Sequence, residues 1–263
     1  IKRTTLIILT FFTVSCMPKN KIDSVEQWID LTHPLDKNTL FWPTSQPFKL
    51  DTVFEGQTEK DYYYSAYNFC MAEHGGTHID APVHFAEGKN SIDQIPIEQL
   101  IGNAIVIDVS LQSSKDPDYL VSTADFQNWE IENGEIPKNS IVIINTGYHQ
   151  YWPDPLRYMG TNKKGEEGVQ ELHFPGLSPK AADWLVKKKI KAIGIDTPSI
   201  DFGQSNLYQS HRTLFEANIP AFENVGNLNS LPLKDFMIYA FPIKISGGSG
   251  GPVRILAKIK STR

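Results

Sequence analysis

Basic charge is scarce in this sequence. The 263 residues include 25 Lys and Arg against 30 Asp and Glu, which gives a formal charge of −5. The basic field that neutralises nucleic-acid phosphates is therefore missing, and we expect no nucleic-acid partner. With 40% hydrophobic and 21% charged residues, the composition is that of an ordinary globular protein that can bury a full core.

The sequence also lacks a linker-like stretch, an internal repeat and a low-complexity tract. A chain of 263 residues lies at the upper end of what a single core supports. Because nothing divides the chain, we expect one large domain over residues 17–263 rather than two small ones.

A hydrophobic run long enough to span a membrane is absent as well. The run from Leu6 to Val14 has nine residues, far fewer than the roughly 20 that cross a bilayer. Two basic residues precede it and small residues lead from it into Cys16, an order typical of a secretory signal. The position of Cys16 resembles the lipobox of a bacterial lipoprotein, although Thr13 departs from the aliphatic residue usual there.

We therefore expect residues 1–16 to be a signal peptide of lipoprotein type. The protein is then exported, and it is periplasmic or anchored to a bacterial membrane only through lipid on Cys16. Simple secretion and an uncleaved terminus are the alternatives.

Cysteine is nearly absent, with two residues in the chain. If Cys16 carries lipid, Cys70 has no partner for an intramolecular disulfide. The fold must then be held by its core or by a metal ion, and we expect Cys70 to be buried in a strand.

Strand and helix signals are both present, which predicts an α/β fold. Short apolar, β-branched runs predict strands at 104–109, 141–145, 190–195 and 236–243, and alternation over 253–259 predicts a further half-buried strand. Ser178 before Pro179 predicts the start of one helix, and Ser122 with Asp125 predicts a capping box for another that reaches Trp129. Residues 151–167 are rich in Pro, Gly, Lys and Asp, and we expect a long surface loop.

Histidine is concentrated in one window, where His74, His78 and His84 lie within eleven residues. These three residues and Asp80 are even numbers of positions apart, so an extended segment places all four side chains on one side. Two glycines and a proline in the window exclude a helix. Imidazoles and a carboxylate that converge in this way suit Zn²⁺, Mn²⁺ or Fe²⁺.

The segment HGGTHIDAPVHF resembles the HxGTHxDxPxH signature of the cyclase family of metal-dependent hydrolases, which includes kynurenine formamidase and isatin hydrolase. Further landmarks are similar: Asp30-Leu31, Trp42-Pro43, GIDTPSID at 194–201 and GGSGGPVR at 247–254. The resemblance thus covers nearly the whole of residues 17–263. It implies a single domain with a mixed sheet or barrel-like β core surrounded by helices, and a homodimer or higher homo-oligomer.

The resemblance also implies the site. His74, His78 and Asp80 correspond to the ligands of the first metal, and His84 to the acid/base residue. In members with two metals the Asp bridges to a second ion, which a His and a Glu twelve residues later also hold, and His211 and Glu223 have that spacing. One or two ions of Zn²⁺ or Mn²⁺ are expected, and His84 as a fourth ligand is the alternative to its acid/base role.

The substrate that this resemblance implies is a small aromatic or cyclic amide, like isatin or N-formylkynurenine, cleaved at its C–N bond by activated water. Aromatic residues near the landmarks are candidates for stacking on a flat substrate. The turn Gly203-Gln204-Ser205 resembles that of the longer, isatin-hydrolase-like members of the family. Gln204 is therefore a further candidate. The candidates for substrate binding are Phe41, Trp42, Phe85, Phe174 and Gln204.

Two other functions remain open at this point. One is a cyclase or dehydratase that uses the same metal centre, and the other is a non-catalytic lipoprotein that binds a metal or a ligand. The full set of His84, His211 and Glu223 argues against the second, because a carrier needs ligands but no acid/base partner. The loop at 246–252 lacks the Lys-Ser/Thr of a phosphate-binding loop, so we expect a tight turn next to the site.

Overall fold

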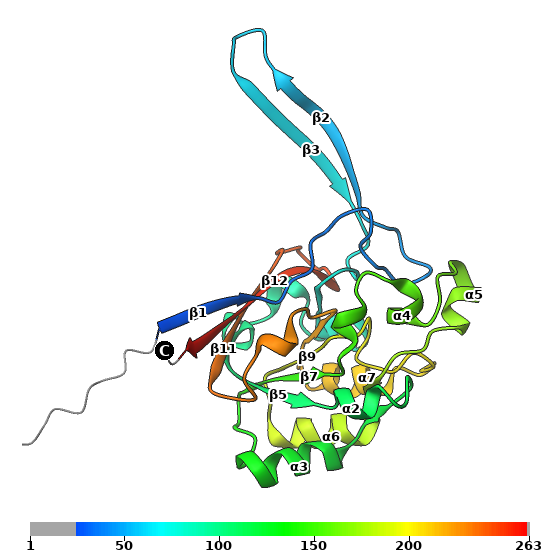
Figure 1. Ribbon diagram of the computed structural model, residues 1–263, viewed down its shortest axis with the longest axis vertical. Coiled ribbons are helices and arrows are strands. Elements are labelled where there is room, and N and C mark those ends of the chain that lie inside the picture. Colours follow the sequence, from blue (N-terminus) through cyan, green and yellow to red (C-terminus); the bar gives the residue numbers. More distant parts are fainter. Residues whose placement is uncertain (1–24, 262–263) are drawn as a thin grey trace, which may run out of the picture.

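The computed structural model describes residues 25–261. Its main sheet has eight strands in the order β1-β12-β11-β5-β7-β9-β10-β4, and β4 also pairs with β12. The second pairing joins the two ends of a seven-strand ring, so the sheet is a closed barrel to which β1 is added (Figure 1). The strands are β1 (Val25–Asp30), β4 (His78–Asp80), β5 (Ile101–Asp108), β7 (Ile141–Asn145), β9 (Ala192–Ile195), β10 (Ala221–Glu223), β11 (Phe236–Pro242) and β12 (Gly250–Ser261).

Closure of the barrel depends on the length of β12. Its first residues, Gly250 to Pro252, pair with β4, whereas Leu256 to Ser261 pair with β1 along the same side. One strand thus has successive partners on one edge and β11 on the other. The pairing with β4 also brings the glycine-rich segment before β12 against the strand that contains His78 and Asp80.

The central strands β5, β7 and β9 are parallel and have apolar side chains on both faces. Val142 and Ile144 point outward into a core cluster that includes residues of the covering helices, such as Phe126 and Leu185. Ile141 and Ile143 point into the barrel and belong to a second cluster. A sheet buried on both faces gives continuous apolar runs rather than alternation, which is the pattern that these strands have.

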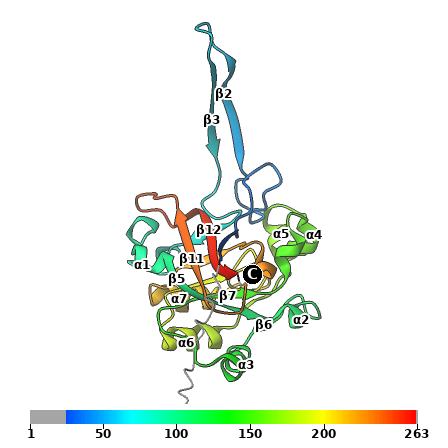
Figure 2. The same cartoon turned by 60° about the vertical axis from the view of Figure 1, so that its left-hand side comes forward.

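Helices surround the barrel and short elements connect its parts (Figure 2). The α-helices are α1 (Ile97–Leu100), α2 (Ser110–Ser113), α3 (Thr123–Asn133), α4 (Pro155–Met159), α5 (Gly165–Gln170), α6 (Pro179–Lys188) and α7 (Gln209–Glu216). The 3₁₀ turns are η1 (Pro82–His84), η2 (Ile92–Gln94), η3 (Tyr148–Tyr151) and η4 (Leu228–Ser230), and β6 (Leu120–Val121) pairs with β8 (Gly176–Leu177). Within residues 25–261, no helix has the length and apolar character needed to cross a membrane.

The predicted α/β domain with a barrel-like mixed sheet is confirmed. Each predicted strand is present, and α6 begins where expected, with Ser178 accepting a hydrogen bond from the Ala181 amide. The capping box of Ser122 and Asp125 is formed, and its helix α3 continues beyond the predicted end at Trp129. Residues 151–167 are not a plain loop, because α4 and the start of α5 lie within them. The predicted signal peptide, residues 1–16, lies outside the described part of the chain.

A long hairpin stands apart from the barrel. It consists of β2 (Lys49–Gln57) and β3 (Tyr63–Cys70), which among the described strands pair only with each other. We call residues 49–70 the arm. In both views the arm projects away from the body (Figures 1 and 2). Cys70 is in a strand as predicted, but the prediction that it is buried is wrong, because Cys70 is exposed on the arm.

Candidate metal centre

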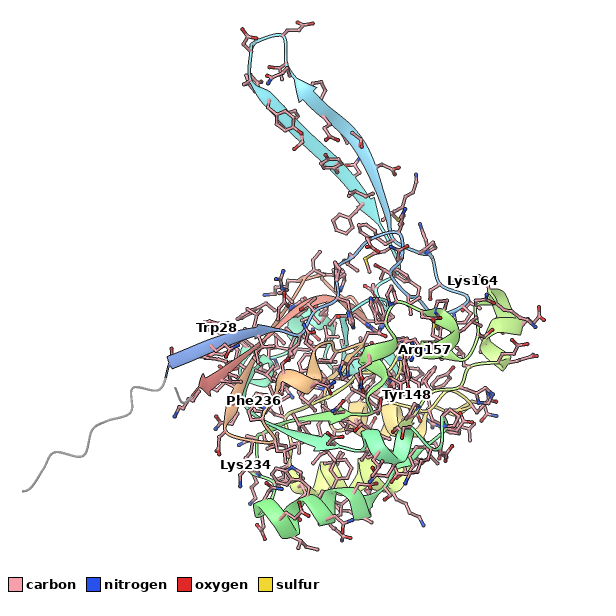
Figure 3. All side chains as sticks on the ribbon, in the orientation of Figure 1. Trp28, Tyr148, Arg157, Lys164, Lys234 and Phe236 are labelled. Atoms are coloured by element: carbon pink, nitrogen blue, oxygen red, sulfur yellow. The ribbon has the colours of Figure 1, made fainter. Side chains whose placement is uncertain are left out.

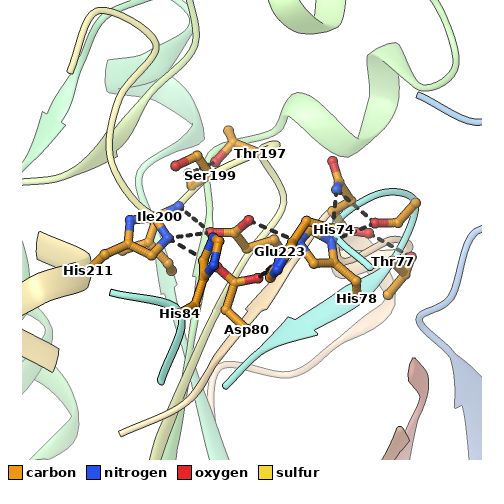
Figure 4. Close-up of polar contacts among 12 residues, drawn as sticks. His74, Thr77, His78, Asp80, His84, Thr197, Ser199, Ile200, His211 and Glu223 are labelled. Atoms are coloured by element: carbon orange, nitrogen blue, oxygen red, sulfur yellow. Dashed lines mark hydrogen bonds and ion pairs between the residues drawn. The ribbon is translucent and has the colours of Figure 1, made fainter. Parts of the chain in front are cut away.

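Five of the residues with predicted roles come together from three elements and one loop (Figure 4). His78 and Asp80 are on β4, and Glu223 lies directly opposite His78 on the neighbouring antiparallel strand β10. His211 is on α7, and His74 precedes β4 in a loop. Cross-strand neighbours on one face lie about 4.5–5.5 Å apart, so the sheet itself places two of the residues within reach of one ion.

The backbone of the histidine window changes conformation along its length. Gly76 has φ +59°, a conformation that favours glycine, and a Cβ at Gly75 would lie 2.1 Å from the Phe41 ring. The window is therefore not one extended segment as predicted: only His78 to Asp80 form a strand, and Pro82 to His84 form the turn η1. The side chains converge nonetheless, because the turn brings His84 back toward Asp80.

The five residues form two overlapping groups of three that share Asp80. One Asp80 oxygen, Oδ1, lies 2.7 Å from His74 Nδ1 and 3.1 Å from His78 Nε2. The other, Oδ2, lies 3.4 Å from His211 Nε2. Glu223 completes the second group, with Oε1 3.0 Å from His211 Nε2 and Oε2 3.3 Å from His78 Nε2. We call the groups the local group (His74, His78 and Asp80) and the distant group (Asp80, His211 and Glu223).

Neighbouring groups orient the imidazoles from behind. His78 Nδ1 donates to the Gly76 carbonyl at 2.9 Å, and His211 Nδ1 donates to Asp201 Oδ2 at 2.7 Å. Each of these rings therefore turns Nε2 toward the carboxylates. The Ile200 amide donates to Glu223 Oε1 at 2.7 Å. Such outer contacts fix the tautomer and direction of metal-ligating histidines.

The arrangement fits a divalent cation. His78 Nε2 is buried and makes no hydrogen bond within residues 25–261, although two carboxylate oxygens lie within 3.3 Å of it. A buried polar atom without a partner is costly, and a metal ion is a partner that accepts its lone pair. Three imidazoles and two carboxylates are a nitrogen and oxygen donor set of the kind that Zn²⁺ and Mn²⁺ accept.

The electrostatics of the buried residues also favour positive charge. Burial lowers the pKa of His78, but the nearby carboxylates of Asp80 and Glu223 outweigh it and raise that pKa to about 10. His211 shows the same balance, and Asp201, Asp80 and Glu223 raise its pKa well above the usual value. Burial raises the pKa of Asp80, but the surrounding histidines outweigh it and hold that pKa well below the usual value. Protons on these histidines balance the negative charge of the buried carboxylates, and a bound cation can balance the same charge.

His84 lies beside this cluster rather than in it. Its Nε2 is 4.0 Å from Asp80 Oδ2, and its ring stacks on that of His74 with 3.9 Å between centroids. Burial is the largest of the effects that lower the pKa of His84 to about 4. An imidazole with that pKa is neutral near pH 7 and can accept a proton.

A cavity of about 250 Å³ opens above these residues. Of the predicted substrate residues, Phe41, Trp42 and Phe85 line it. Phe174 is fully buried behind it and meets the Trp42 ring edge-on at 6.3 Å, so it supports the wall rather than facing a ligand. Gln204 is not in the lining; its amide donates to the Leu172 carbonyl at 2.6 Å.

Several residues that shape the site were not singled out from the sequence. Tyr208, Met159 and Asn224 line the cavity, and Asp201 orients His211. Asp201 lies in the GIDTPSID landmark, ten residues before His211. That landmark is the feature of the sequence that could have pointed to Asp201. Tyr208 and Met159 follow no pattern that marks them, because tertiary structure alone brings them to the cavity.

Comparisons with known proteins identify the family of this chain. Residues 29–202 match the family model described as "Putative cyclase". An isatin hydrolase of Roseibium aggregatum is 32% identical over 245 residues, which cover 88% of this chain and 91% of that protein. A kynurenine formamidase of Bacillus cereus is 29% identical over 236 residues, with 88% and 97% covered.

The fold is also found among solved structures. Isatin hydrolase A from Labrenzia aggregata, bound to benzyl benzoate, matches with a TM-score of 0.80 and 28% identity over 90% of this chain and 94% of that one. The fold of this chain is therefore shared, over most of its length, with an isatin hydrolase whose structure is solved.

Proposed function

This chain belongs to the cyclase family of metal-dependent hydrolases, and we propose that it is an amidohydrolase that cleaves the C–N bond of a small aromatic or cyclic amide. One observation carries the proposal. Two groups of metal-ligating side chains share Asp80 at the base of a cavity walled by aromatic rings, with a neutral histidine beside them.

Each group of residues has a task in this reaction. His74, His78, Asp80, His211 and Glu223 hold one or two divalent ions, Zn²⁺ or Mn²⁺. When bound, such an ion supplies Lewis acidity, which makes water nucleophilic near neutral pH and polarises a carbonyl. Because Asp80 is common to both groups, its carboxylate would help to hold either one ion or two.

His84 transfers the proton. Its neutral imidazole accepts a proton from the attacking water and returns it to the leaving nitrogen, which is general base and general acid catalysis by one residue. The ring faces the cavity and is fixed by stacking on His74. Its distance of 4.0 Å from Asp80 leaves it outside the ligand set, which favours the acid/base role over a role as fourth ligand.

The walls of the cavity select the substrate. Phe41, Trp42 and Phe85 offer flat apolar surface for an aromatic ring. Isatin and N-formylkynurenine both carry such a ring next to an amide bond. The relatives named isatin hydrolase and kynurenine formamidase support this substrate class.

The test combines elemental analysis with hydrolysis of both compounds on one preparation of the purified protein. We expect one or two equivalents of Zn or Mn and turnover of at least one compound. Chelation followed by return of the metal should remove and restore turnover. Protein without metal under non-chelating conditions would contradict the proposed centre, and metal with no turnover of any aromatic amide would contradict the proposed substrate class.

We also propose that the protein is a homo-oligomer that covers the arm. Eight large hydrophobic side chains of the arm are between 39% and 59% exposed, and side chains stand on both sides of the hairpin without covering structure (Figure 3). A two-stranded hairpin is marginally stable alone in water, and exposed apolar patches of this size mark interaction sites. Light scattering should give at least twice the monomer mass, and a monomer at micromolar concentration would contradict this.

Export through residues 1–16, with lipid on Cys16, is the remaining proposal. The basic residues, the short apolar run and the position of Cys16 support it. In a bacterial host, the full chain should be found in the membrane fraction, and Cys16→Ser should release it. A full chain found in the cytoplasm would contradict export.

A further inference from the structure

The segment before β12 contacts the back of the His74 ring. Ser249 Oγ lies 2.9 Å from His74 Nε2, the ring nitrogen that faces away from Asp80. Ser249 also donates twice to Glu73 Oε2, through its hydroxyl at 2.6 Å and its amide at 3.1 Å. A residue adjacent to His74 in sequence is thus joined to it through a residue 175 positions away.

The direction of these hydrogen bonds follows from what each group can donate. An ionised carboxylate can only accept hydrogen bonds, so the Ser249 hydroxyl donates its single hydrogen bond to Glu73. The Ser249 oxygen then has only lone pairs to offer His74, and His74 must donate its Nε2–H to it. With Nε2 protonated and held, Nδ1 is the His74 atom that faces the centre, 2.7 Å from Asp80 Oδ1.

This orientation is opposite to that of the other two histidines. His78 and His211 donate through Nδ1, to Gly76 and Asp201, and turn Nε2 toward the carboxylates. We propose that Glu73 and Ser249 are positioning residues that hold His74 as an Nδ1 ligand, through the chain of hydrogen bonds from the Glu73 carboxylate to the Ser249 hydroxyl and on to His74 Nε2. The inference rests on the metal centre of the proposed function.

The segment around Ser249 is shaped for this contact. A Cβ at Gly250 would lie 2.5 Å from His74 Cε1, and a Cβ at Gly248 would lie 2.8 Å from a Glu73 oxygen. The Ala81 amide donates to the Ser249 carbonyl at 2.8 Å, which ties the segment to the end of β4. Glycines on either side of Ser249 thus permit the close approach, and the backbone bond fixes it.

The first test measures metal affinity directly, by competition of the full-length protein with a chromophoric chelator for Zn²⁺. Loss of an outer partner of a ligating histidine typically weakens metal binding roughly 10- to 100-fold, and we expect Ser249→Ala to fall in this range. Glu73→Gln should lose less, because an amide oxygen still accepts from Ser249. Ser246→Ala is the matched control, since Ser246 is an exposed serine of the same loop, and it should bind as the wild type does.

The second test observes the His74 ring itself, by long-range ¹H–¹⁵N correlation spectra of the Zn²⁺-loaded protein with ¹⁵N-labelled histidine. We expect His74 to carry its proton on Nε2 and to be ligated at Nδ1, and we expect that proton to exchange with water faster in Ser249→Ala. His74 ligated through Nε2, or equal Zn²⁺ affinity in Ser249→Ala and Ser246→Ala, would overturn the proposal. In those outcomes the wild type still binds Zn²⁺, whereas failure of the proposed function would appear as a wild type that binds none.

Discussion

The local and distant groups of the metal centre differ in how the chain assembles them. The local group comes from seven consecutive residues, His74 to Asp80, whereas the distant group needs α7 and β10 to meet β4. His74 is 23% exposed and is held through a loop serine, while His211 and Glu223 are nearly fully buried. A group encoded by one segment still depends on distant residues for its orientation, and a group built from distant elements is the better enclosed.

The largest effect should come from Asp80, the residue that both groups share. Asp80→Asn keeps the size of the side chain but removes the charge that both groups use, so we expect metal affinity to fall by more than the roughly 100-fold that marks the upper end for outer partners. The bound metal, measured by elemental analysis, and the turnover should both be lost. Retention of a full complement of metal would show that the two groups do not depend on their common residue.

The next effect separates holding the metal from catalysis. His84→Ala should lower the turnover rate roughly 10²- to 10⁴-fold, the usual contribution of a general acid or base, while metal content stays unchanged. His173→Ala is the control, because His173 is an exposed histidine paired with Asp118. If His84→Ala lost metal as well, His84 would belong with the ligands.

Asp201 tests how far the distant group depends on its outer contacts. Asp201→Asn leaves an oxygen that can accept from His211 Nδ1 but removes the charge, so we expect metal affinity to fall about 10-fold, the lower end for such partners. Asp183→Asn, at an exposed pair on α6, should change nothing. An equal affinity in both variants would show that burial alone orients His211.

Removal of the metal should make stability depend on pH. The native pKa of His78 is raised from 6.5 to about 10, and that of His211 is raised as well. The stabilisation that this gives is complete below pH 6.5 and is lost as the pH rises toward 10. Urea unfolding of the metal-free protein should therefore give a smaller free energy of unfolding at pH 9.5 than at pH 6.5.

The metal-loaded protein is the control for that measurement, because the cation replaces the protons and the difference should shrink. A metal-free protein that is equally stable at both pH values would show that protons do not substitute for the ion in the buried groups.

The smallest effect should come from Gln204. Its amide contacts backbone carbonyls outside the cavity, so Gln204→Ala should change the KM and turnover rate no more than about 2-fold, as for surface substitutions worth up to roughly 0.5 kcal/mol. Trp42→Ala, which removes cavity wall, provides the contrast. A large effect of Gln204→Ala on KM would show that Gln204 contributes to substrate binding.

The sequence revealed the local group more readily than the distant one, for a physical reason. Even spacing in one segment is visible without a fold, and it pointed to His74, His78, Asp80 and His84 together. His211 and Glu223 carry no such periodicity, and only the resemblance to a family selected them among many acids and histidines. Ser249 and Tyr208 are brought in by barrel closure and by the start of α7, which no local pattern encodes.

The fold was predictable to a similar depth. Apolar runs and capping residues indicated the strands and helices, because burial and end capping are local demands on sequence. Closure of the sheet could not be predicted from the sequence pattern. It depends on β12 pairing first with β4 and then with β1 along the same edge. The exposure of Cys70 was missed because the residues of a hairpin do not reveal whether the rest of the protein covers it.

The pairing of β4 with β12 has a consequence for biosynthesis. A ribosome makes β4 long before β12, yet Ser249 and the strand that closes the barrel both lie at the far end of the described chain. A nascent chain that displays only the histidine window has neither the neighbouring strands nor the serine that orients His74. Full assembly of the metal centre therefore requires β12 to have been made and paired with β4.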